Sequence, residues 1–168
     1  MRTINFNWNN HIKLDADVLP ELKPLKGKVW EFLIPDIDTD YRVFKSFHDN
    51  RYYIFNGNNV VSILTFYGRI LRFRSLEPTL NKVVVGKEYN NLLDGTLKVS
   101  FSGSDFFVGE RLVGNIGSEN RLSWAVKCLL KFKLLAYNPW NGIRYDETII
   151  DQGLALTLLI SEVASLDS

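Results

Sequence analysis

The segment Ile149–Val163 is apolar on every side of a helix, and it constrains the fold more than any other part of the chain. It reads Ile-Ile-Asp-Gln-Gly-Leu-Ala-Leu-Thr-Leu-Leu-Ile-Ser-Glu-Val. At helical periodicity, the leucines and isoleucines between Gly153 and Ile160 cover all directions around the axis. This dry stretch spans only about 12 Å, far short of the roughly 30 Å of a bilayer core. We therefore expect the segment to be enclosed by protein.

The residues before this segment predict where the helix begins. Asp146 and Glu147 place negative charge at the positive end of the helix dipole. Thr148, with Asp151 three residues later, resembles a capping box, although that box prefers Glu or Gln at its last position. We expect a buried C-terminal helix over 146–165 that begins near Thr148, and Gly153 suggests close approach of a strand at that point.

The rest of the chain predicts a mainly β protein. A length of 168 residues fits a single domain, 1–168, which buries roughly 70% of its unfolded surface. Residues 1–28 are polar and rich in turn formers, which favours an irregular or one-turn-helical arm with Phe6 and Trp8 packed on the body. The strand-rich body, 29–137, contains short β-branched and aromatic runs typical of strands. We predict strands at Val29–Ile34, Tyr41–Phe47, Arg51–Phe55, Val60–Tyr67, Arg69–Arg74, Lys82–Val85, Thr96–Phe101 and Glu110–Ile116.

Two turn signals join these strands into an antiparallel meander. Asn56-Gly57-Asn58-Asn59 and Asp94-Gly95 supply the positive φ values that tight hairpins need. Thr96–Phe101 alternates apolar and polar residues, which indicates a sheet with one wet face. Combined with the C-terminal helix, the meander predicts a closed barrel around a buried helix, an α+β variant of a mainly β fold.

The segment 122–136 fits two templates. With a period of two, its apolar residues share one face and Lys127, Lys131 and Lys133 lie opposite, which predicts a long strand. With helical periodicity, it predicts a basic amphipathic helix. The unbroken alternation and the strands before it favour the strand.

The end of the chain resembles the tubby-like C-terminal domain family, which includes scramblase-like and LURP-one-related proteins. The resemblance rests on Leu112-Val113-Gly114-Asn115-Ile116, on Tyr145-Asp146, and on Gly153-Leu-Ala-Leu-Thr-Leu-Leu-Ile-Ser-Glu-Val163. It covers roughly the last third of the chain with apolar patterns of low specificity, and a helix over 122–136 would break it. The resemblance implies a barrel around the last helix and a non-enzymatic module at lipid or membrane surfaces. It maps no functional residue onto this chain.

Charge and cysteine content narrow the classes of partner and compartment. A net charge of +1 disfavours nonspecific nucleic-acid binding. The single cysteine, Cys128, has apolar neighbours that predict a buried, inert thiol, and one cysteine fits a reducing cytoplasmic compartment or the periphery of a membrane. The N-terminus has no signal-peptide core, and no run is long enough for a membrane span.

Two basic groups are the candidate binding residues. Arg69, Arg72 and Arg74 alternate with apolar residues, while Lys127, Lys131 and Lys133 form a stripe beside apolar residues. Either group is able to contact an anion or a lipid headgroup, and either also fits a charged face that keeps strand edges soluble.

No stretch of the chain carries a catalytic, cofactor or metal pattern. Asp36-x-Asp38-x-Asp40 begins like a calcium loop, but Tyr41 stands where the loop needs Gly and Phe47 where it needs Glu, so we expect an acidic turn. The four tryptophans are expected to pack in the core or its rim instead of forming a ligand cage, and they are Trp8, Trp30, Trp124 and Trp140.

Three hypotheses about function follow. The first is a non-enzymatic binding module that recognises an anionic lipid or a protein partner at a membrane surface. The second is a β-barrel carrier of a small hydrophobic ligand. The third is an enzyme whose site is assembled by residues distant in sequence.

Overall fold

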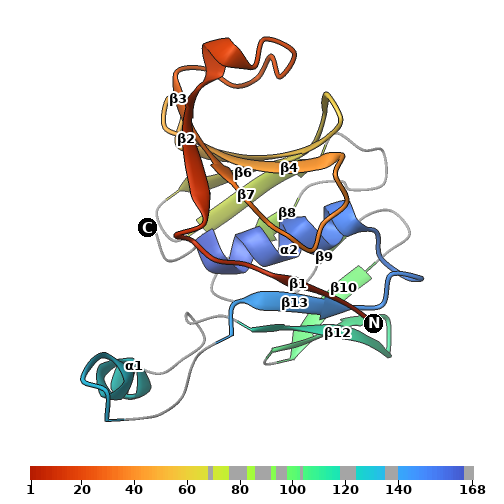
Figure 1. The fold of residues 1–168 in the computed structure, drawn as a ribbon. Helices are drawn as coiled ribbons and strands as arrows, with labels where there is room; N and C mark the ends of the chain where they lie inside the picture. Colours follow the sequence, from red (N-terminus) through yellow and green to blue (C-terminus); the bar gives the residue numbers. More distant parts are fainter. Residues whose placement is uncertain are drawn as a thin grey trace.

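A computed structural model describes residues 1–67, 70–75, 83–85, 92–93, 98–102, 104–117, 124–134 and 140–164. Over these residues the strands form two antiparallel sheets (Figure 1). The six-stranded sheet has the order β1 (Arg2–Asn5), β13 (Gly142–Tyr145), β12 (Arg111–Gly117), β11 (Asp105–Val108), β10 (Lys98–Ser102) and β9 (Leu92–Leu93). The seven-stranded sheet has the order β2 (His11–Asp15), β3 (Lys28–Phe32), β4 (Tyr41–Ser46), β5 (Arg51–Asn56), β6 (Asn59–Tyr67), β7 (Ile70–Ser75) and β8 (Val83–Val85).

The predicted meander is confirmed, since strands that follow one another in sequence are neighbours throughout β2–β8 and β9–β12. The hairpin between β5 and β6 turns at Gly57, whose φ of 59° is the left-handed value that the sequence predicted. In the described residues the two sheets share no strand pairing, so the structure shows two sheets and not one closed ring. The turn predicted at 94–95 lies outside the described residues.

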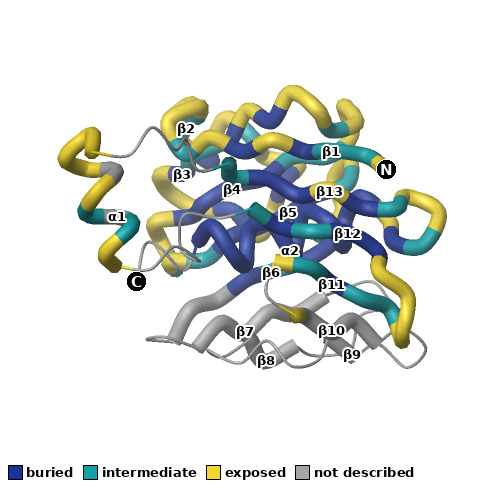
Figure 2. The backbone as a smooth tube through the Cα atoms, turned by 90° about the horizontal axis from the view of Figure 1, so that it is seen from below, coloured by how far each residue is buried: buried dark blue, intermediate teal, exposed yellow. Residues whose placement is uncertain are grey.

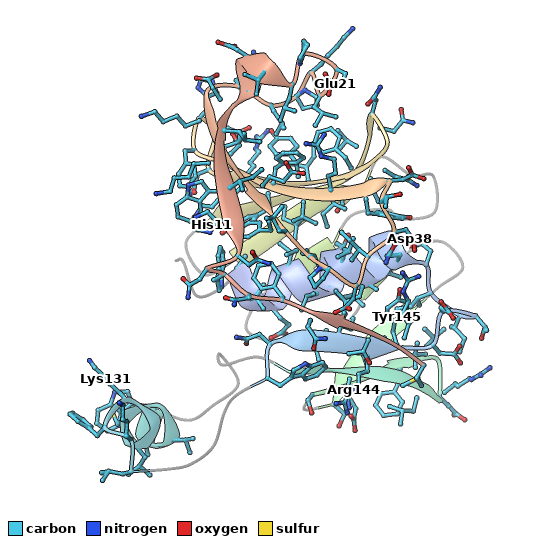
Figure 3. All side chains as sticks on the ribbon, viewed as in Figure 1. His11, Glu21, Asp38, Lys131, Arg144 and Tyr145 are labelled. Carbon is cyan, nitrogen blue, oxygen red and sulfur yellow. The ribbon has the colours of Figure 1, made fainter. Side chains whose placement is uncertain are left out.

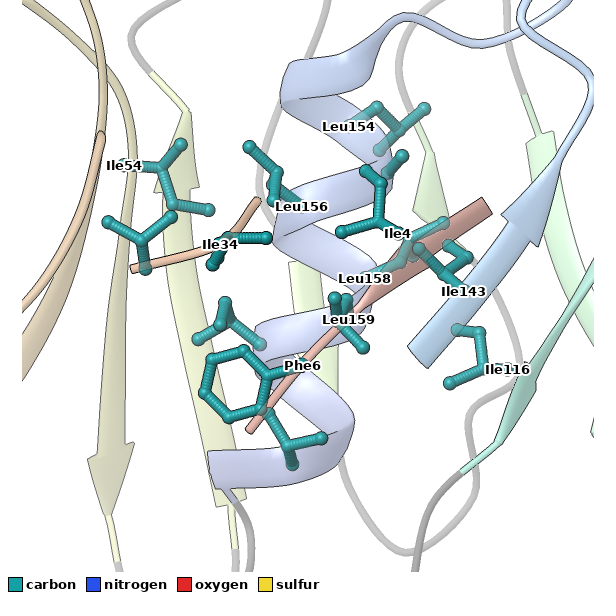
Figure 4. Packing of buried hydrophobic residues seen from close by; sticks show 14 of the residues in the cluster. Ile4, Phe6, Ile34, Ile54, Ile116, Ile143, Leu154, Leu156, Leu158 and Leu159 are labelled. Atoms are coloured by element: carbon teal, nitrogen blue, oxygen red, sulfur yellow. The ribbon is translucent and has the colours of Figure 1, made fainter. Parts of the chain in front are cut away.

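The helix α2 (Gln152–Ala164) lies between the two sheets (Figure 1). All 13 of its residues are buried, and the same burial is visible along its whole length in Figure 2. Side chains of both sheets point at the helix from opposite sides, as Ile54 and Ile143 do in Figure 4. The predicted enclosure of an all-round apolar helix is therefore confirmed, because two sheets together cover every direction around it.

The helix starts later than the sequence predicted. Thr148 does not cap α2, because its hydroxyl and backbone N–H both donate to Asp146 in the preceding turn. Asp151 is the cap, since its Oδ1 accepts from the backbone N–H of Leu154 at 2.7 Å. The sequence prediction used Asp151 as the last position of a capping box that begins at Thr148, whereas Asp151 itself is the N-cap.

Gly153 lies where α2 packs closely against β6. A Cβ at this position would stand 2.9 Å from Cγ1 of Val61 and 3.4 Å from Cε1 of Tyr41. Four residues later, the hydroxyl of Thr157 lies 2.8 Å from that of Ser62 and also donates to the Gly153 carbonyl. The predicted strand approach at Gly153 is confirmed, and a buried hydrogen bond fixes the helix on that strand.

The N-terminal 28 residues are not an irregular arm, and that prediction is wrong. They contain β1, which pairs with β13, and β2, which pairs with β3. Their polar composition hid these strands, because β2 is an edge strand whose residues are mostly exposed. Between the two strands, Phe6 and Trp8 pack into the main core as expected.

Residues 16–27 include a one-turn 3₁₀ helix (Ala16–Val18) and cover the outer face of the seven-stranded sheet. They do so through a second apolar cluster, which contains Ala16, Leu22, Leu25, Val29, Phe44, Tyr53 and Phe55.

The favoured strand over 122–136 is also wrong. Residues Trp124–Lys131 form a helix, α1, in the connection between β12 and β13. Alternation in this segment does not reflect a sheet, because none of the described strands pairs with it and the helix lies apart from both sheets (Figures 1 and 2). Cys128 is partly exposed on this helix, which corrects the expectation of a buried thiol. A helix in this segment breaks the resemblance to the tubby-like family.

Candidate functional site

One row of side chains on the inner face of the seven-stranded sheet alternates lysine and aromatic residues. The strand register places Lys13 of β2 opposite Trp30 of β3, Trp30 opposite Lys45 of β4, and Lys45 opposite Tyr52 of β5. Residues opposite each other share one face of a sheet. We call these four residues the lysine–aromatic row.

Lys45 occupies the centre of an aromatic cage. Its Nζ lies 6.0 Å from the ring centroids of Trp8 and Trp30, 5.5 Å from that of Tyr52 and 5.2 Å from that of Phe47. The residue is buried, with 8% of its surface exposed. Cation–π attraction in a desolvated site is worth about 2 kcal/mol, so the rings stabilise an ammonium that would otherwise be costly to bury. The expectation that Trp8 and Trp30 only pack in the core or its rim therefore misses their contact with this charge.

The same aromatic surface continues to the exterior. The ring of His11 stacks on Trp30 with centroids 4.0 Å apart, and Phe47 meets Trp30 edge to face at 4.9 Å. Phe47 is exposed, with 43% of its surface accessible. A depression of about 480 Å³ opens here and is lined by Lys13, Leu14, Asp15, Lys28, Val29, Trp30 and Phe47.

The position of the depression follows from the length of the core. One row further along the same face, Phe32, Val43 and Ile54 are buried in the main core. One row in the opposite direction, Asp15 and Lys28 are exposed. The inner face of the sheet therefore extends beyond the enclosed core, and its last row opens to solvent.

The second candidate region is α1 with the turn that ends it, residues 124–134, which we call the α1 lobe. It projects from the connection between β12 and β13 (Figures 1 and 3). Its apolar side chains are exposed to 81% at Trp124, 69% at Phe132, 71% at Leu134 and 39% at Leu129. The expectation that Trp124 packs in the core or its rim is wrong. Apolar side chains grouped on a projection typically mark an interaction surface.

The α1 lobe also presents two of the three predicted lysines. Lys131 ends the helix and Lys133 follows it, and both are exposed. Lys133 has a φ of 56°, and the backbone N–H of Leu134 donates to the carbonyl of Leu129 at 2.9 Å. This is the Schellman pattern with lysine at the position that glycine usually takes. Lys127 lies in the middle of α1, and its side chain is outside the described residues.

The other predicted basic group is described only in part. Arg72 and Arg74 lie in β7, opposite Thr65 and Ile63 of β6. Their side chains and the whole of Arg69 are outside the described residues.

The acidic turn after Pro35 has structural partners. Arg2 of β1 donates to Oδ1 of Asp38 at 2.8 Å, and Asn5 donates through its backbone and side chain to Asp36. These bonds tie the six-stranded sheet to the β3–β4 connection. In the described part of the chain, no group of three or more His, Cys, Asp or Glu residues is placed to hold a metal ion.

Ionisable groups on the outer face of the seven-stranded sheet serve packing. Burial, together with the hydrogen bond that its hydroxyl donates to the Asp49 carboxylate, raises the pKa of Tyr53 to about 12. Arg42 makes two hydrogen bonds with Glu31, at 2.7 and 2.9 Å, which raise the pKa of the guanidinium. Both groups contact the second apolar cluster or its edge and face away from the depression.

The lysine–aromatic row was missed by sequence reasoning. Its signal is present in the alternation of Lys28 with Trp30 and of Lys45 with Phe47. Each pattern alone is typical of an amphipathic strand, and only the cross-strand register brings them together.

No family model, no curated protein and no solved structure matches this chain. Among the described residues, no helix is long and apolar enough to cross a membrane.

Proposed function

We propose that this protein is a non-enzymatic module that binds the surface of an anionic membrane through the α1 lobe. The observation that carries the proposal is the exposure of Trp124, Phe132 and Leu134 beside Lys131 and Lys133 on a projecting helix. Helices that lie in the membrane interface combine these residue types, with aromatic and leucine side chains on one face and lysines on the other.

The apolar side chains supply most of the binding energy. Full burial of a large apolar side chain contributes about 1.5–3 kcal/mol. Trp124, Phe132 and Leu134 are each more than two-thirds exposed, so their transfer into the interface contributes roughly 4 kcal/mol together.

The lysines of the α1 lobe favour a membrane surface that carries negative charge. Each lysine near an anionic leaflet contributes about 1 kcal/mol, and this attraction decays within a Debye length. Lys131 and Lys133 therefore add roughly 2 kcal/mol on an anionic surface and nothing comparable on a zwitterionic one. This charge favours an anionic bilayer over an uncharged apolar groove of a protein partner.

The size of α1 fits a position in the interface plane. Eight helical residues are about 12 Å long, which is short for a span but sufficient for an apolar face that enters the interface by about 5–10 Å. The expected location is the cytoplasmic leaflet, because it carries anionic lipids and a reducing compartment suits the single cysteine.

The fold adds one feature that the tubby-like resemblance also implies, since two sheets enclose a hydrophobic C-terminal helix. Because the helix α1 breaks that resemblance, the proposal rests on the α1 lobe and not on the family. In the described residues the space between the sheets is filled by α2, so this part of the molecule offers the carrier hypothesis no interior site.

Vesicle sedimentation tests the proposal. The protein should sediment with phosphatidylcholine vesicles that contain phosphatidylserine and stay in solution with vesicles of phosphatidylcholine alone. The double variant Trp124→Ser/Phe132→Ser should weaken partitioning by about 3 kcal/mol, roughly a hundredfold. Lys131→Gln/Lys133→Gln should weaken it by more than tenfold at low salt and by less at high salt.

Matched controls come from exposed residues elsewhere. Leu112→Ser and Val18→Ser remove apolar side chains that are 55% and 64% exposed but lie outside the α1 lobe, and both should bind like the wild type. If the wild type ignores phosphatidylserine, or if Leu112→Ser weakens binding as much as the α1 variants, the proposal is refuted.

A further inference from the structure

We propose that the depression beside the lysine–aromatic row is a second binding site, for an amphiphilic anion with a phosphate or carboxylate head and an aliphatic body. This inference goes beyond the proposed function and does not depend on the α1 lobe. Its volume of about 480 Å³ lies within the 300–1,000 Å³ that is typical of small-molecule sites.

The depression has an apolar part that suits an aliphatic chain. Trp30 and Phe47 form its aromatic wall. Leu14 and Val29 border the depression, but their side chains lie on the outer face with the second apolar cluster, so the apolar part is supplied by the two aromatic rings. The ring of His11 already stacks on Trp30 at 4.0 Å, and Phe47 packs edge to face against it. Since these contacts occupy the ring, Trp30 is poorly placed to stack on a planar base, and a flexible aliphatic body fits better.

Two ammonium groups define the polar part. Lys13 and Lys28 are both exposed, and the register places them diagonally, because Lys13 is opposite Trp30 and Lys28 is opposite Asp15. Diagonal neighbours lie about 7–8 Å apart, a spacing that two long side chains bridge around one anionic group. Neither lysine forms a salt bridge with any residue that the structure describes.

The one acidic residue of the lining is otherwise engaged. The Oδ1 of Asp15 accepts from the backbone N–H of Asp17 at 3.1 Å and caps the 3₁₀ helix. Two lysines therefore face the depression against one aspartate that holds a backbone N–H. The positive charge of the two lysines favours an anionic ligand, and the aromatic wall favours a ligand with an apolar body.

The depression and the α1 lobe lie toward the same side of the molecule. His11, which stacks on Trp30, and Lys131 of α1 are both on the left in Figure 3. An amphiphile in the depression therefore comes either from a membrane that α1 touches or from free solution, and the experiment separates these sources.

Titration with dihexanoylphosphatidic acid below its micelle concentration tests the site. Heat of binding gives the affinity, and the indole N–H signals of the four tryptophans, assigned by single Trp→Phe substitutions, give the location by NMR. We expect saturable binding that shifts the Trp30 signal and leaves the Trp124 signal in place. Lys13→Gln/Lys28→Gln should weaken binding by about tenfold or more.

The controls vary the head, the body and the lysines. Dihexanoylphosphatidylcholine and inorganic phosphate should each bind at least about tenfold more weakly, and Lys23→Gln/Lys26→Gln, which changes two exposed lysines outside the lining, should bind like the wild type. The proposal is overturned if phosphatidic acid does not bind, if the Trp30 signal stays in place, or if Lys13→Gln/Lys28→Gln binds normally. If inorganic phosphate binds as tightly as dihexanoylphosphatidic acid, the apolar body does not contribute, and the proposal of an amphiphilic ligand is overturned.

The same titration on Trp124→Ser/Phe132→Ser separates this site from the α1 lobe. That variant should no longer sediment with vesicles, but it should still bind dihexanoylphosphatidic acid. If the wild type sediments with vesicles but does not bind dihexanoylphosphatidic acid, only the site in the depression is refuted. If it binds dihexanoylphosphatidic acid but does not sediment with vesicles, only the proposed function is refuted.

Discussion

The buried hydroxyl pair Ser62–Thr157 gives the sharpest test of how α2 is held between the sheets. The two oxygens are 2.8 Å apart, and Ser62 and Thr157 are 0% and 1% exposed. Thr157→Val keeps the shape of the side chain but leaves the Ser62 hydroxyl buried without this partner, at a cost of about 1–3 kcal/mol. For a chain of this size, each kcal/mol lowers Tm by about 2–4 °C.

The double variant provides the refutation. Ser62→Ala should cost less than Thr157→Val, because the Thr157 hydroxyl keeps its hydrogen bond to the Gly153 carbonyl. In Ser62→Ala/Thr157→Val no hydroxyl of the pair is left unsatisfied, so the free energy of unfolding should fall by about 1 kcal/mol less than the sum of the single effects. Denaturant unfolding of the four proteins measures this coupling. Additive effects, within about 0.5 kcal/mol, would show that the helix does not contact β6 in this register.

Four further predictions concern stability. Gly153→Ala should destabilise the protein although alanine favours helices by about 1 kcal/mol, because its Cβ would meet Val61 Cγ1 at 2.9 Å; adding Val61→Ala should restore part of the loss in thermal unfolding. Asp151→Ala removes the N-cap of α2 and should lower the free energy of unfolding by about 1 kcal/mol, and an unchanged value would contradict the cap. Leu156→Asp places a carboxylate at a fully buried position at a cost of several kcal/mol, so a soluble variant with wild-type circular dichroism would disprove the enclosure. Burial raises the pKa of Tyr53 to about 12, above the ordinary value of about 10. The stabilisation from the neutral phenol is therefore complete below pH 10 and is lost as pH rises towards 12. In denaturant unfolding, the free energy of unfolding of Tyr53→Phe should decline less over that pH range than that of the wild type.

The candidate sites differ in how far the sequence reveals them. Lys131 and Lys133 were identified because a lysine stripe beside apolar residues is a local pattern, although the strand was favoured over the helix that carries them. Lys13 and Lys28 were missed because both lie in residues 1–28, which the sequence predicted to be an irregular arm. They become a site only when β2 pairs with β3 and brings Trp30 between them.

The amino-acid sequence by itself predicted β3–β8, β10, β12 and the enclosure of the last helix, because strand periodicity and apolar content are local properties of the chain. It did not predict the short strands β9, β11 and β13. It did not determine β1 and β2, whose few apolar residues are buried by partners distant in sequence. Only the tertiary structure shows that two sheets enclose α2 and that residues 124–131 form a helix with Trp124 and Leu129 exposed. The physical reason is that strand register, enclosure and exposure depend on contacts between segments that are distant in sequence. The residues of any one segment do not determine the energy of those contacts.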